Sequence, residues 1–562
     1  MPRLTVAAYA ASLKRALEVR KVALAASLAV AGGLALTLAL RALYRAPLNV
    51  DEELTLRIAH DSFGSIFGVV RHRGGGPFHF WLEYLTARWP GGLAGLRLPS
   101  VFFALASLPA VALVAVELAG TAEAAATVLL VASAPLFISY SSFGRPHTML
   151  LAWISWGTVL ALRAARLDSR RWWIAAGALL GSSVFVHPTA PLYAITAFGC
   201  AVIYARRPPA AWPGAIALAI TLVPYYASTA HVLTSRYGVG GGTSGRTFSG
   251  NPVWVDAIHF VTPLPGKINW FTIGAAIGLA VLLVQRRWRV AAVLVLTVAA
   301  PVVFFSVVPT SGLSAIFFDR YMLPVLPAFL LLVAIACTTI ARLAWRLRLV
   351  ALACLVAWLM SYGARVVLAR QTQLARLGLG PLTTAVRAES ANTVLFGSTG
   401  FTLPGGYLGY FTFGRPPNLA DRYLSLRIPS LTFVNDDACA PVVSFLAKGG
   451  PPQHGLWVFW AVRDGDRDKA VAAFRRVQAV ELTQPYRHFI VLRSKAALPP
   501  RALVELGLEL RHAWLRAVPF NQRATLLVNA DATALDDPAG CKPIGVLGDP
   551  DIVPNYPLPA SP

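Results

Sequence analysis

The 562-residue chain is poor in acidic residues, with 26 Asp and Glu against 50 Lys and Arg, and only 14% of its residues are charged. Hydrophobic residues make up 56% of the chain, a fraction that excludes an ordinary soluble protein and indicates an integral membrane protein. The net charge of +24 does not indicate nucleic-acid binding, because the basic residues cluster in short loops between apolar runs.

Cysteine is also scarce, and its five residues exclude a disulfide-rich scaffold. Cys200, Cys337 and Cys354 lie within apolar runs, where we expect them to be packed. Cys439 and Cys541 lie in the more polar C-terminal part, and the sequence leaves open whether they form a disulfide outside the cell.

Long apolar runs divide residues 22–369 into about eleven predicted membrane spans, because a helix needs roughly 20 apolar residues to cross a bilayer. The predicted spans are Val22–Leu43, Leu96–Leu118, Ala122–Tyr140, Thr148–Leu167, Trp172–Val186, Ala190–Ala205, Ala211–His231, Ile268–Val284, Val290–Val308, Met322–Ala341 and Leu347–Leu368. The first run exceeds the apolar core of a cleaved signal peptide, and further spans follow it, so we expect an uncleaved anchor.

Basic residues set the predicted orientation of these spans. The N-terminal tail, residues 1–21, ends in a basic cluster that holds it in the cytoplasm. Threading the spans alternately places four Arg-rich loops on the same side, as the positive-inside rule requires. These loops are residues 163–171, 206–207, 286–289 and 342–348.

Two long loops then lie on the outer side. Residues 44–95 carry apolar residues at helical spacing, which predicts short helices on the membrane surface. Residues 233–267 are rich in Gly and Ser, and this loop is either a flexible connector or a segment that orders over substrate.

Residues 370–562 have the composition of a soluble domain. The runs "TVLFGS", "GLWVFWAV" and "HFIVLRS" predict strands, and "DRDKAVAAFRRVQAV" predicts an amphipathic helix. Strands that alternate with a helix favour a small α/β domain. The predicted fold is therefore an α-helical polytopic membrane protein with a C-terminal extracytoplasmic α/β domain.

The acidic pair Asp51-Glu52 follows the first span at the outer membrane surface. A carboxylate at this place can act as a general base for a hydroxyl or bind a metal. The following segment, "ELTLRIAH", is apolar at helical spacing, so the pair could equally cap a helix. The sequence alone leaves both roles open.

Other polar residues lie at the predicted outer ends of spans. His79 and Glu83 are four residues apart, a spacing that suits either a metal ligand pair or a packed His near the membrane interface. Arg145, His147, His187, Asp319 and Arg320 also lie at this level. An Arg there can simply reach lipid phosphates, but several cations around an acidic pair would suit a lipid-linked phosphate.

Six motifs in this order resemble the bacterial branch of the dolichyl-phosphate-mannose protein mannosyltransferase family (glycosyltransferase family 39), to which the aminoarabinose transferases of lipid A are similar. The motifs are "LNVDEELTLRIA", "GGGPFHFWLEYL", "LRLPSVFFAL", "SAPLFISYSSFGRPHTMLLAW", "VFVHPTAPLYA" and "FFDRYMLPVLP", within residues 45–330. "GPFHF" departs from the His-Pro-Pro type of sequence common at its place in the family.

The resemblance implies a GT-C fold and a glycosyltransferase whose sugar donor is linked to polyprenyl phosphate. The acceptor would be a hydroxyl on a protein, lipid or glycan at the outer face of the cell membrane. Asp51 corresponds to the catalytic base, with Glu52 as its neighbour. The donor phosphate would lie against Arg145, Arg320, His147 and His187, and substrate against His79, Glu83 and Asp319.

The cofactor and the exact activity stay open at this stage. Some GT-C enzymes need a divalent metal such as Mg²⁺ or Mn²⁺, whereas the nearest relatives do not, so we predict no metal. Another GT-C enzyme, such as an arabinofuranosyltransferase, is an alternative, as is a receptor whose outer domain binds glycan. A transporter or flippase of lipid-linked sugars is a further alternative, although the chain shows no repeated halves.

Overall fold

A computed structural model describes the chain as two units. The described residues are 6–45, 52, 55, 58–59, 62–72, 76–87, 93–205, 207–236, 253–262, 268–307, 319–343, 346–359, 392–397, 432–435, 445–460, 464–485, 489–517, 527–528 and 543–544. The first unit is helical and comprises residues 1–45, 55–89 and 94–368, whereas the second comprises 46–54, 90–93 and 369–562. Each unit is described below by itself.

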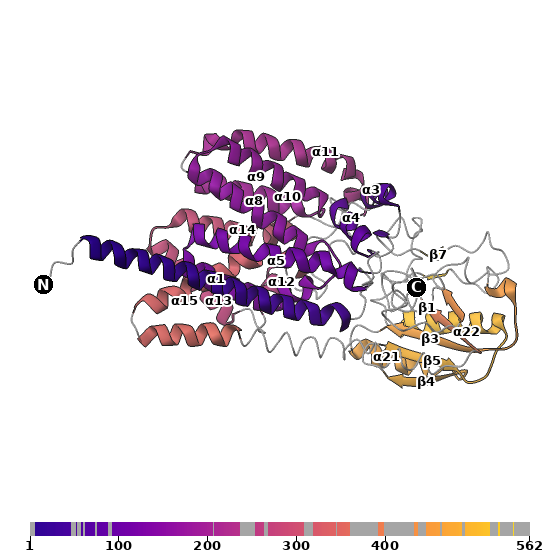
Figure 1. Cartoon of the computed structure of the whole chain (residues 1–562). Coiled ribbons are helices and arrows are strands. Elements are labelled where there is room, and N and C mark those ends of the chain that lie inside the picture. The colour runs from indigo at the N-terminus through magenta and orange to yellow at the C-terminus, as the bar shows by residue number, and fades with distance from the viewer. Residues whose placement is uncertain are drawn as a thin grey trace. The chain divides into compact units, whose positions relative to one another are not determined.

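The first unit is built from helices and short 3-10 turns (Figure 1). The helices are α1 (Val6–Arg45), α3 (Phe63–His72), α4 (Pro77–Thr86), α5 (Leu93–Leu118), α6 (Thr121–Ser133), α7 (Pro135–Ser141), α8 (His147–Leu167), α9 (Arg170–Ser182), α10 (Ala190–Tyr204), α11 (Trp212–Arg236), α12 (Val253–Val261), α13 (Trp270–Val284), α14 (Trp288–Val307) and α15 (Leu326–Leu343), with another over 346–359. The 3-10 turns are η1 (Ser183–Phe185), η2 (Pro208–Ala211) and η4 (Asp319–Met322).

Within the described residues, five helices are long and apolar enough to cross a membrane, or six if the bent pair α6–α7 counts as one span. The five segments are Lys21–Leu40, Ala94–Leu118, His147–Leu167, Trp288–Val307 and Leu326–Leu343. The bend of 61° between α6 and α7 follows from Pro135, which begins α7 after an extended Ala134. These helices make the chain a multi-pass membrane protein, while the count of about eleven spans stays a prediction.

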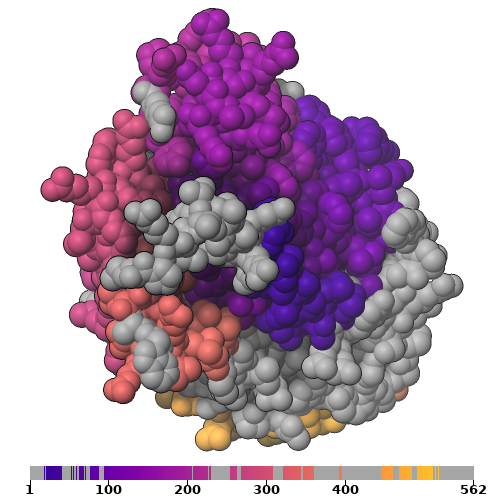
Figure 2. Space-filling model, turned by 60° about the vertical axis from the view of Figure 1, so that its left-hand side comes forward, coloured from indigo at the N-terminus to yellow at the C-terminus, as the bar shows by residue number. Residues whose placement is uncertain are grey.

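Glycines at four-residue spacing let two pairs of helices approach closely. A Cβ on Gly177 of α9 would lie 2.0 Å from the carbonyl oxygen of Gly214 on α11. A Cβ on Gly278 of α13 would lie 1.9 Å from the carbonyl oxygen of Leu332 on α15. Such small residues are typical of helix packing in membranes. Figure 2 shows the group that contains α9 and α11 as the purple to magenta lobe at the top.

Ion pairs gather at one end of the helical unit, in the Arg-rich loops. Arg166 Nη1 lies 3.0 Å from Glu117 Oε2, which joins the C-terminal ends of α8 and α5. Arg342 Nη2 lies 2.5 Å from Glu123 Oε1, which joins the end of α15 to the start of α6. Tyr204, at the end of α10, donates a hydrogen bond to the carbonyl of Glu117. Helices α8, α10 and α15 therefore end together and begin at the opposite end of the unit.

The prediction that the three cysteines in apolar runs are packed is correct for two of them. Cys200 and Cys337 are buried, but Cys354 is exposed on the helix over 346–359, so the prediction that it is packed is wrong. Its helix also exposes apolar side chains such as Leu352, an exposure that suits contact with lipid. The pair Cys439 and Cys541 lies outside the described residues.

The second unit contains a five-stranded sheet in the order β2-β1-β3-β5-β4. The strands are β1 (Thr393–Gly397), β2 (Thr432–Asn435), β3 (His454–Trp460), β4 (Val480–Pro485) and β5 (Phe489–Ser494). β1 pairs in parallel with β2 and β3, whereas β5 is antiparallel to β3 and β4. The helices are α21 (Asp464–Phe474) and α22 (Pro500–Ala517), and β6 (Leu527–Val528) pairs with β7 (Pro543–Ile544).

One predicted element in this unit is too long. The helix expected over "DRDKAVAAFRRVQAV" ends at Phe474 as α21, and Val480 already belongs to strand β4, where it pairs with Ser494. Val477 and Val480 are buried in the core formed by the sheet and helices. Their spacing from Phe474 suits a helix equally well, which is why the sequence pattern did not show the break.

Candidate functional site

Four predicted site residues meet at the end of the helical unit where α8, α10 and α15 begin. Arg145 and His147 lie at the start of α8, His187 lies before α10, and Arg320 lies in η4 before α15. The ring centroids of His147 and His187 are 5.3 Å apart. Burial lowers the pKa of His187 to about 3, and the charges of Arg320 and Arg145 act in the same direction. We call these four residues the Arg–His cluster.

The turn before α8 places Arg145. Its Nη1 donates to Oγ1 of Thr55 at 3.3 Å, a contact with the segment that follows the first span. Ser100 of α5 holds the same turn from the other side, because its Oγ lies 2.5 Å from the carbonyl oxygen of Phe143 and 3.1 Å from that of Arg145. Thr148 in turn donates from Oγ1 to the carbonyl of Ser100 at 2.9 Å. The backbone of the turn that carries Arg145 is thus held between α5 and α8, while its guanidinium contacts Thr55.

Ser100 is expected to be a positioning residue for Arg145. In Ser100→Ala the two turn carbonyls lose the hydroxyl, and we expect kcat/KM for the sugar donor to fall about tenfold, equivalent to roughly 1.4 kcal/mol. The loss should appear mainly as a higher donor KM in steady-state transfer assays. The matched control is Ser107→Ala on the same helix, where the buried hydroxyl donates to the carbonyl of Ala104 in its own helix. An equal change of donor KM in both variants would show a general effect on α5 instead.

Arg320 is held through the backbone and ring of its neighbour. Tyr193 of α10 donates from its hydroxyl to the carbonyl oxygen of Tyr321 at 2.5 Å. The ring of Tyr321 stacks on Phe305 of α14 at a centroid distance of 4.8 Å. The Arg320 guanidinium lies 5.6 Å from the centroid of the Tyr321 ring. Residues from α10 and α14 therefore fix the short η4 turn that presents Arg320.

The two imidazoles of the cluster differ in their surroundings. His187 is partly exposed, and its Nδ1 accepts a hydrogen bond from the backbone N–H of Thr189 at 3.2 Å, so Nε2 carries the proton of the neutral ring. His147 is 3% exposed and packs against the rings of Tyr140 and Phe143. Within the described part of the chain, Nε2 of His147 has no hydrogen-bond partner.

His79 and Glu83 form a buried pair on α4. Both side chains are 0% exposed, and His79 Nε2 lies 2.7 Å from Glu83 Oε1. Burial lowers the pKa of His79 to about 3, Arg145 acts in the same direction, and a hydrogen bond with the backbone of Gly144 opposes them. The pair therefore lies near the Arg145 turn, but away from solvent. Its predicted contact with substrate stays a prediction.

Gly76 brings α4 against the segment that carries His187. A Cβ on Gly76 would lie 2.2 Å from the carbonyl carbon and oxygen of Phe185, and such a contact requires the backbone to move. We expect Gly76→Ala to destabilise the helical unit by about 1–3 kcal/mol, measured as a lower thermal midpoint in detergent. Gly68→Ala on α3 is the control, since a Cβ there meets nothing within 4 Å, and a small stabilisation is expected. Equal stability of the two variants would contradict the close approach.

The remaining predicted site residues are described only in part. Asp51 lies outside the described residues, and the side chain of Asp319 is not described, although its backbone opens η4. Glu52 is 1% exposed and is grouped with the second unit. Among the described residues, no three His, Cys, Asp or Glu side chains are close enough to share a metal ion.

Some residues near the cluster were not singled out from the sequence. Arg97 of α5 is 1% exposed, and a buried guanidinium requires partners. Ser100 and Thr55 hold the Arg145 turn, as described above. The only sequence signal for Arg97 is a basic residue inside an apolar run, while Ser100 and Thr55 are ordinary polar residues whose contacts are formed by the fold.

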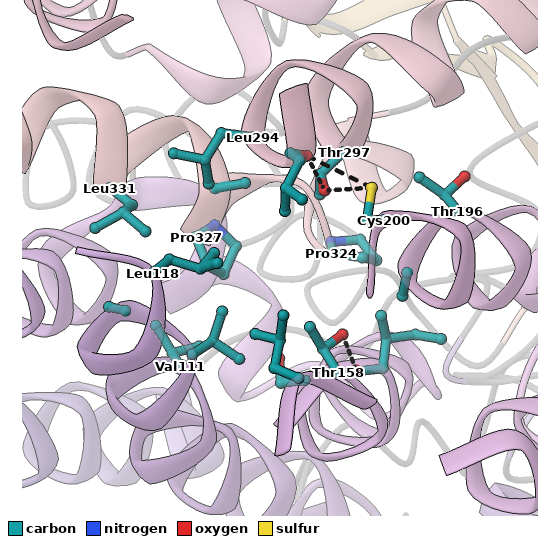
Figure 3. Close-up of a pocket in the computed structure, with 18 of the residues that line it drawn as sticks. Val111, Leu118, Thr158, Thr196, Cys200, Leu294, Thr297, Pro324, Pro327 and Leu331 are labelled. Carbon is teal, nitrogen blue, oxygen red and sulfur yellow. Dashed lines mark hydrogen bonds between the residues drawn. The ribbon is translucent and has the colours of Figure 1, made fainter. Parts of the chain in front are cut away.

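A cavity of about 70 Å³ lies among α5, α6, α8, α10, α14 and α15 (Figure 3). None of the described residues that line it is charged, and hydroxyls such as those of Thr158 and Thr297 donate to carbonyls of their own helices. Tyr193, which supports η4, lines this cavity too. The interior between these helices is thus apolar, and the charged groups of the cluster lie at the ends of the helices.

Comparison with known proteins shows what the chain and its fold resemble. Residues 75–228 match the model of the dolichyl-phosphate-mannose-protein mannosyltransferase family, a segment that contains His79, Arg145, His147 and His187. The structure is similar to that of ArnT from Cupriavidus metallidurans bound to undecaprenyl phosphate, with a TM-score of 0.50 and 16% identity over 84% of this chain and 98% of ArnT. This chain is a membrane protein whose fold is similar to that of ArnT, and its residues 75–228 resemble the dolichyl-phosphate-mannose-protein mannosyltransferases. The resemblance predicted from the six motifs is confirmed.

Two further comparisons complete these findings. The apo structure of the same ArnT has a TM-score of 0.49 and 16% identity, over 83% of this chain and 97% of ArnT. No curated protein matches the sequence. A sequence identity of 16% shows a similar fold.

Proposed function

We propose that this GT-C protein is a membrane glycosyltransferase that moves a sugar from a polyprenyl-phosphate donor to a hydroxyl acceptor at the outer face of the cell membrane. The observation that carries the proposal is the Arg–His cluster, in which two guanidiniums and two imidazoles gather at helix N-termini. The structurally similar ArnT binds undecaprenyl phosphate, which supports a polyprenyl phosphate as the lipid carrier here.

The cluster has the chemistry that a phosphate needs. Arg145 and Arg320 are permanently charged, and a guanidinium binds two phosphate oxygens at once. The N-termini of α8 and α10 add partial positive charge, and neither has a side-chain cap that would occupy its N–H groups. Nε2 of His147 has no hydrogen-bond partner in the described part of the chain, and a phosphate oxygen would provide one.

The proposed reaction is a direct displacement. Asp51, with Glu52 as its neighbour, takes the proton of the acceptor hydroxyl, and the oxygen attacks the anomeric carbon of the sugar. The bond from that carbon to the phosphate oxygen breaks, and Arg145 and Arg320 stabilise the charge that develops on the phosphate. One displacement inverts the configuration at the anomeric carbon. His79, Glu83 and Asp319 are proposed to act on the substrate side.

The test is a transfer assay with the purified full-length protein in phosphatidylcholine nanodiscs. Radiolabelled polyprenyl-phosphate mannose, aminoarabinose and arabinofuranose are supplied in turn, with protein, lipid and glycan fractions of a bacterial envelope as acceptors. We expect one donor to release polyprenyl phosphate in step with labelled acceptor, and the product to have the opposite anomeric configuration by NMR. Movement of an intact donor across the bilayer without its cleavage would instead show a flippase and overturn the proposal.

A further inference from the structure

The charge of the bound phosphate changes during the proposed reaction. The donor is a phosphate diester with one negative charge, whereas the released polyprenyl phosphate is a monoester that carries two charges above its second pKa of about 6. The balance is acceptor–OH plus sugar–O–PO₂⁻–O–lipid, giving acceptor–O–sugar plus lipid–O–PO₃²⁻ and one proton. A site of fixed charge cannot match the charges of both the diester and the monoester. A group that takes up a proton when the product is bound would raise the positive charge of the site to match the monoester.

His187 has the geometry of such a group. Arg145 faces it from the turn before α8, Arg320 from η4, His147 from α8 and His79 from α4. Burial and the two guanidiniums hold the pKa of His187 near 3, which keeps the imidazole neutral at neutral pH. A phosphate dianion placed between the guanidiniums reverses the sign of the local field, which favours the charged imidazole.

The contacts of His187 suit both protonation states. Its Nδ1 lies 2.8 Å from the hydroxyl oxygen of Thr189 and accepts from the backbone N–H of the same residue. In the neutral ring, Nδ1 keeps that acceptor role and Nε2 carries the proton. In the charged ring, Nδ1–H donates to the Thr189 hydroxyl, and Nε2–H stays directed to a ligand. Gain of a proton therefore exchanges the bond from the Thr189 N–H for a bond from Nδ1–H to the Thr189 hydroxyl.

His147 has a different part in the same site. It is buried, and its Nε2 has no hydrogen-bond partner among the described residues, although the ring packs closely against Tyr140, Phe143 and His187. A buried polar atom without a partner is unfavourable, and it indicates a place for a ligand atom. A non-bridging phosphate oxygen, present in both diester and monoester, would satisfy it.

We propose that His187 takes up one proton when the site holds a phosphate monoester, so that the protein distinguishes the product from the donor by charge, while His147 bonds an oxygen common to both. This inference rests on the proposed function. The proton comes from solvent and goes to Nδ1 of His187, and no bond of the phosphate changes in this step. Release of the product then requires loss of that proton.

The experiment measures proton uptake by the full-length protein in phosphatidylcholine nanodiscs. Calorimetric titrations at pH 7.5 in two buffers of different ionisation enthalpy use undecaprenyl phosphate and its methyl ester, a diester with one charge. We expect uptake of close to one proton with the monoester and none with the methyl ester. The Kd of the monoester should fall about tenfold from pH 8 to pH 7, the change expected for one proton bound with the ligand.

Two variants separate the roles of the imidazoles. In His187→Gln the amide cannot titrate, so proton uptake should disappear, and the Kd of the monoester should rise by a larger factor than that of the methyl ester. In His147→Phe both ligands should bind more weakly, by a similar factor, with uptake retained. His259→Gln on α12 is the control, because that side chain is 37% exposed and contacts Asp256; uptake should be unchanged.

The outcomes distinguish this inference from the proposed function. Monoester binding without proton uptake, equal uptake with the methyl ester, or undiminished uptake in a folded His187→Gln protein would each overturn the role of His187. If His187→Gln does not fold, the comparison of monoester with methyl ester in the original protein decides. Failure of both ligands to bind, together with absence of sugar transfer, would overturn the proposed function as well.

Discussion

Replacing Asp51 by Asn is expected to lower the rate of sugar transfer by about 10²–10⁴-fold, the contribution usual for a general base. Asn has nearly the same shape and can still hydrogen-bond the acceptor hydroxyl, but it cannot take the proton. The donor should therefore bind within a few-fold of its original Kd, and the loss should appear in kcat. Single-turnover transfer from a labelled polyprenyl-phosphate sugar measures this step separately from binding.

The neighbouring carboxylate provides the control for this prediction. In Glu52→Gln the change of charge is the same and the position differs by one residue, so a smaller loss is expected if Asp51 is the base. The rate of the original protein should fall at acidic pH as the base is protonated, and this fall should be absent from the residual activity of Asp51→Asn. An unchanged rate of sugar transfer in Asp51→Asn would exclude Asp51 as the general base. A larger loss of rate in Glu52→Gln than in Asp51→Asn would assign that role to Glu52.

Replacing Arg320 by Ala is expected to lower kcat by about 10²–10³-fold, as for loss of one group that stabilises charge in a transition state. The guanidinium belongs to η4, before α15, and acts with Arg145 on His187, where the proposed reaction develops charge on the leaving phosphate. Arg320→Lys should be intermediate, because an ammonium keeps the charge but cannot bind two oxygens in the guanidinium geometry. Initial rates at saturating donor measure both variants.

The control for Arg320 lies at the opposite end of the helical unit. Arg166 is 68% exposed and pairs with Glu117, an exposed ion pair whose loss changes stability by only about 0–1 kcal/mol. Arg166→Ala should therefore leave transfer almost unchanged. If Arg166→Ala and Arg320→Ala lost activity equally, a general effect of Arg removal on the membrane fold would explain both, and Arg320 would have no specific role.

Much of the helical unit could be predicted from the sequence because membrane spans are long and apolar. The predicted spans Leu96–Leu118 and Thr148–Leu167 differ by only a few residues from α5 and α8. In the second unit, strands β1, β3 and β5 occur where short apolar runs predicted them. The short strand β2 was not predicted, because four residues carry little periodic signal. The helix α22 was missed although its apolar residues recur at helical spacing, a pattern that predicts an amphipathic helix.

The candidate site residues could be chosen from the sequence by residue type and position, but the sequence did not show which contacts hold their side chains in place. Arg145, His147, His187 and Arg320 are polar residues at the ends of apolar runs, and a bilayer makes such residues conspicuous. Nothing in the sequence showed that Ser100 clamps the Arg145 turn or that Tyr193 supports η4. These contacts join residues that are 43 to 128 positions apart, so no local pattern records them.

By itself the sequence determined that this is a multi-pass membrane protein that resembles the dolichyl-phosphate-mannose-protein mannosyltransferases, because apolar length and the order of six motifs are local properties. Only the tertiary structure decided which polar residues meet: it gathered Arg145, His147, His187 and Arg320, and it buried His79 with Glu83. The physical reason is that α8, α10 and α15 run in the same direction, so residues distant along the chain share one end of the unit. Close glycine contacts and Arg-loop ion pairs hold the packed helices in that arrangement.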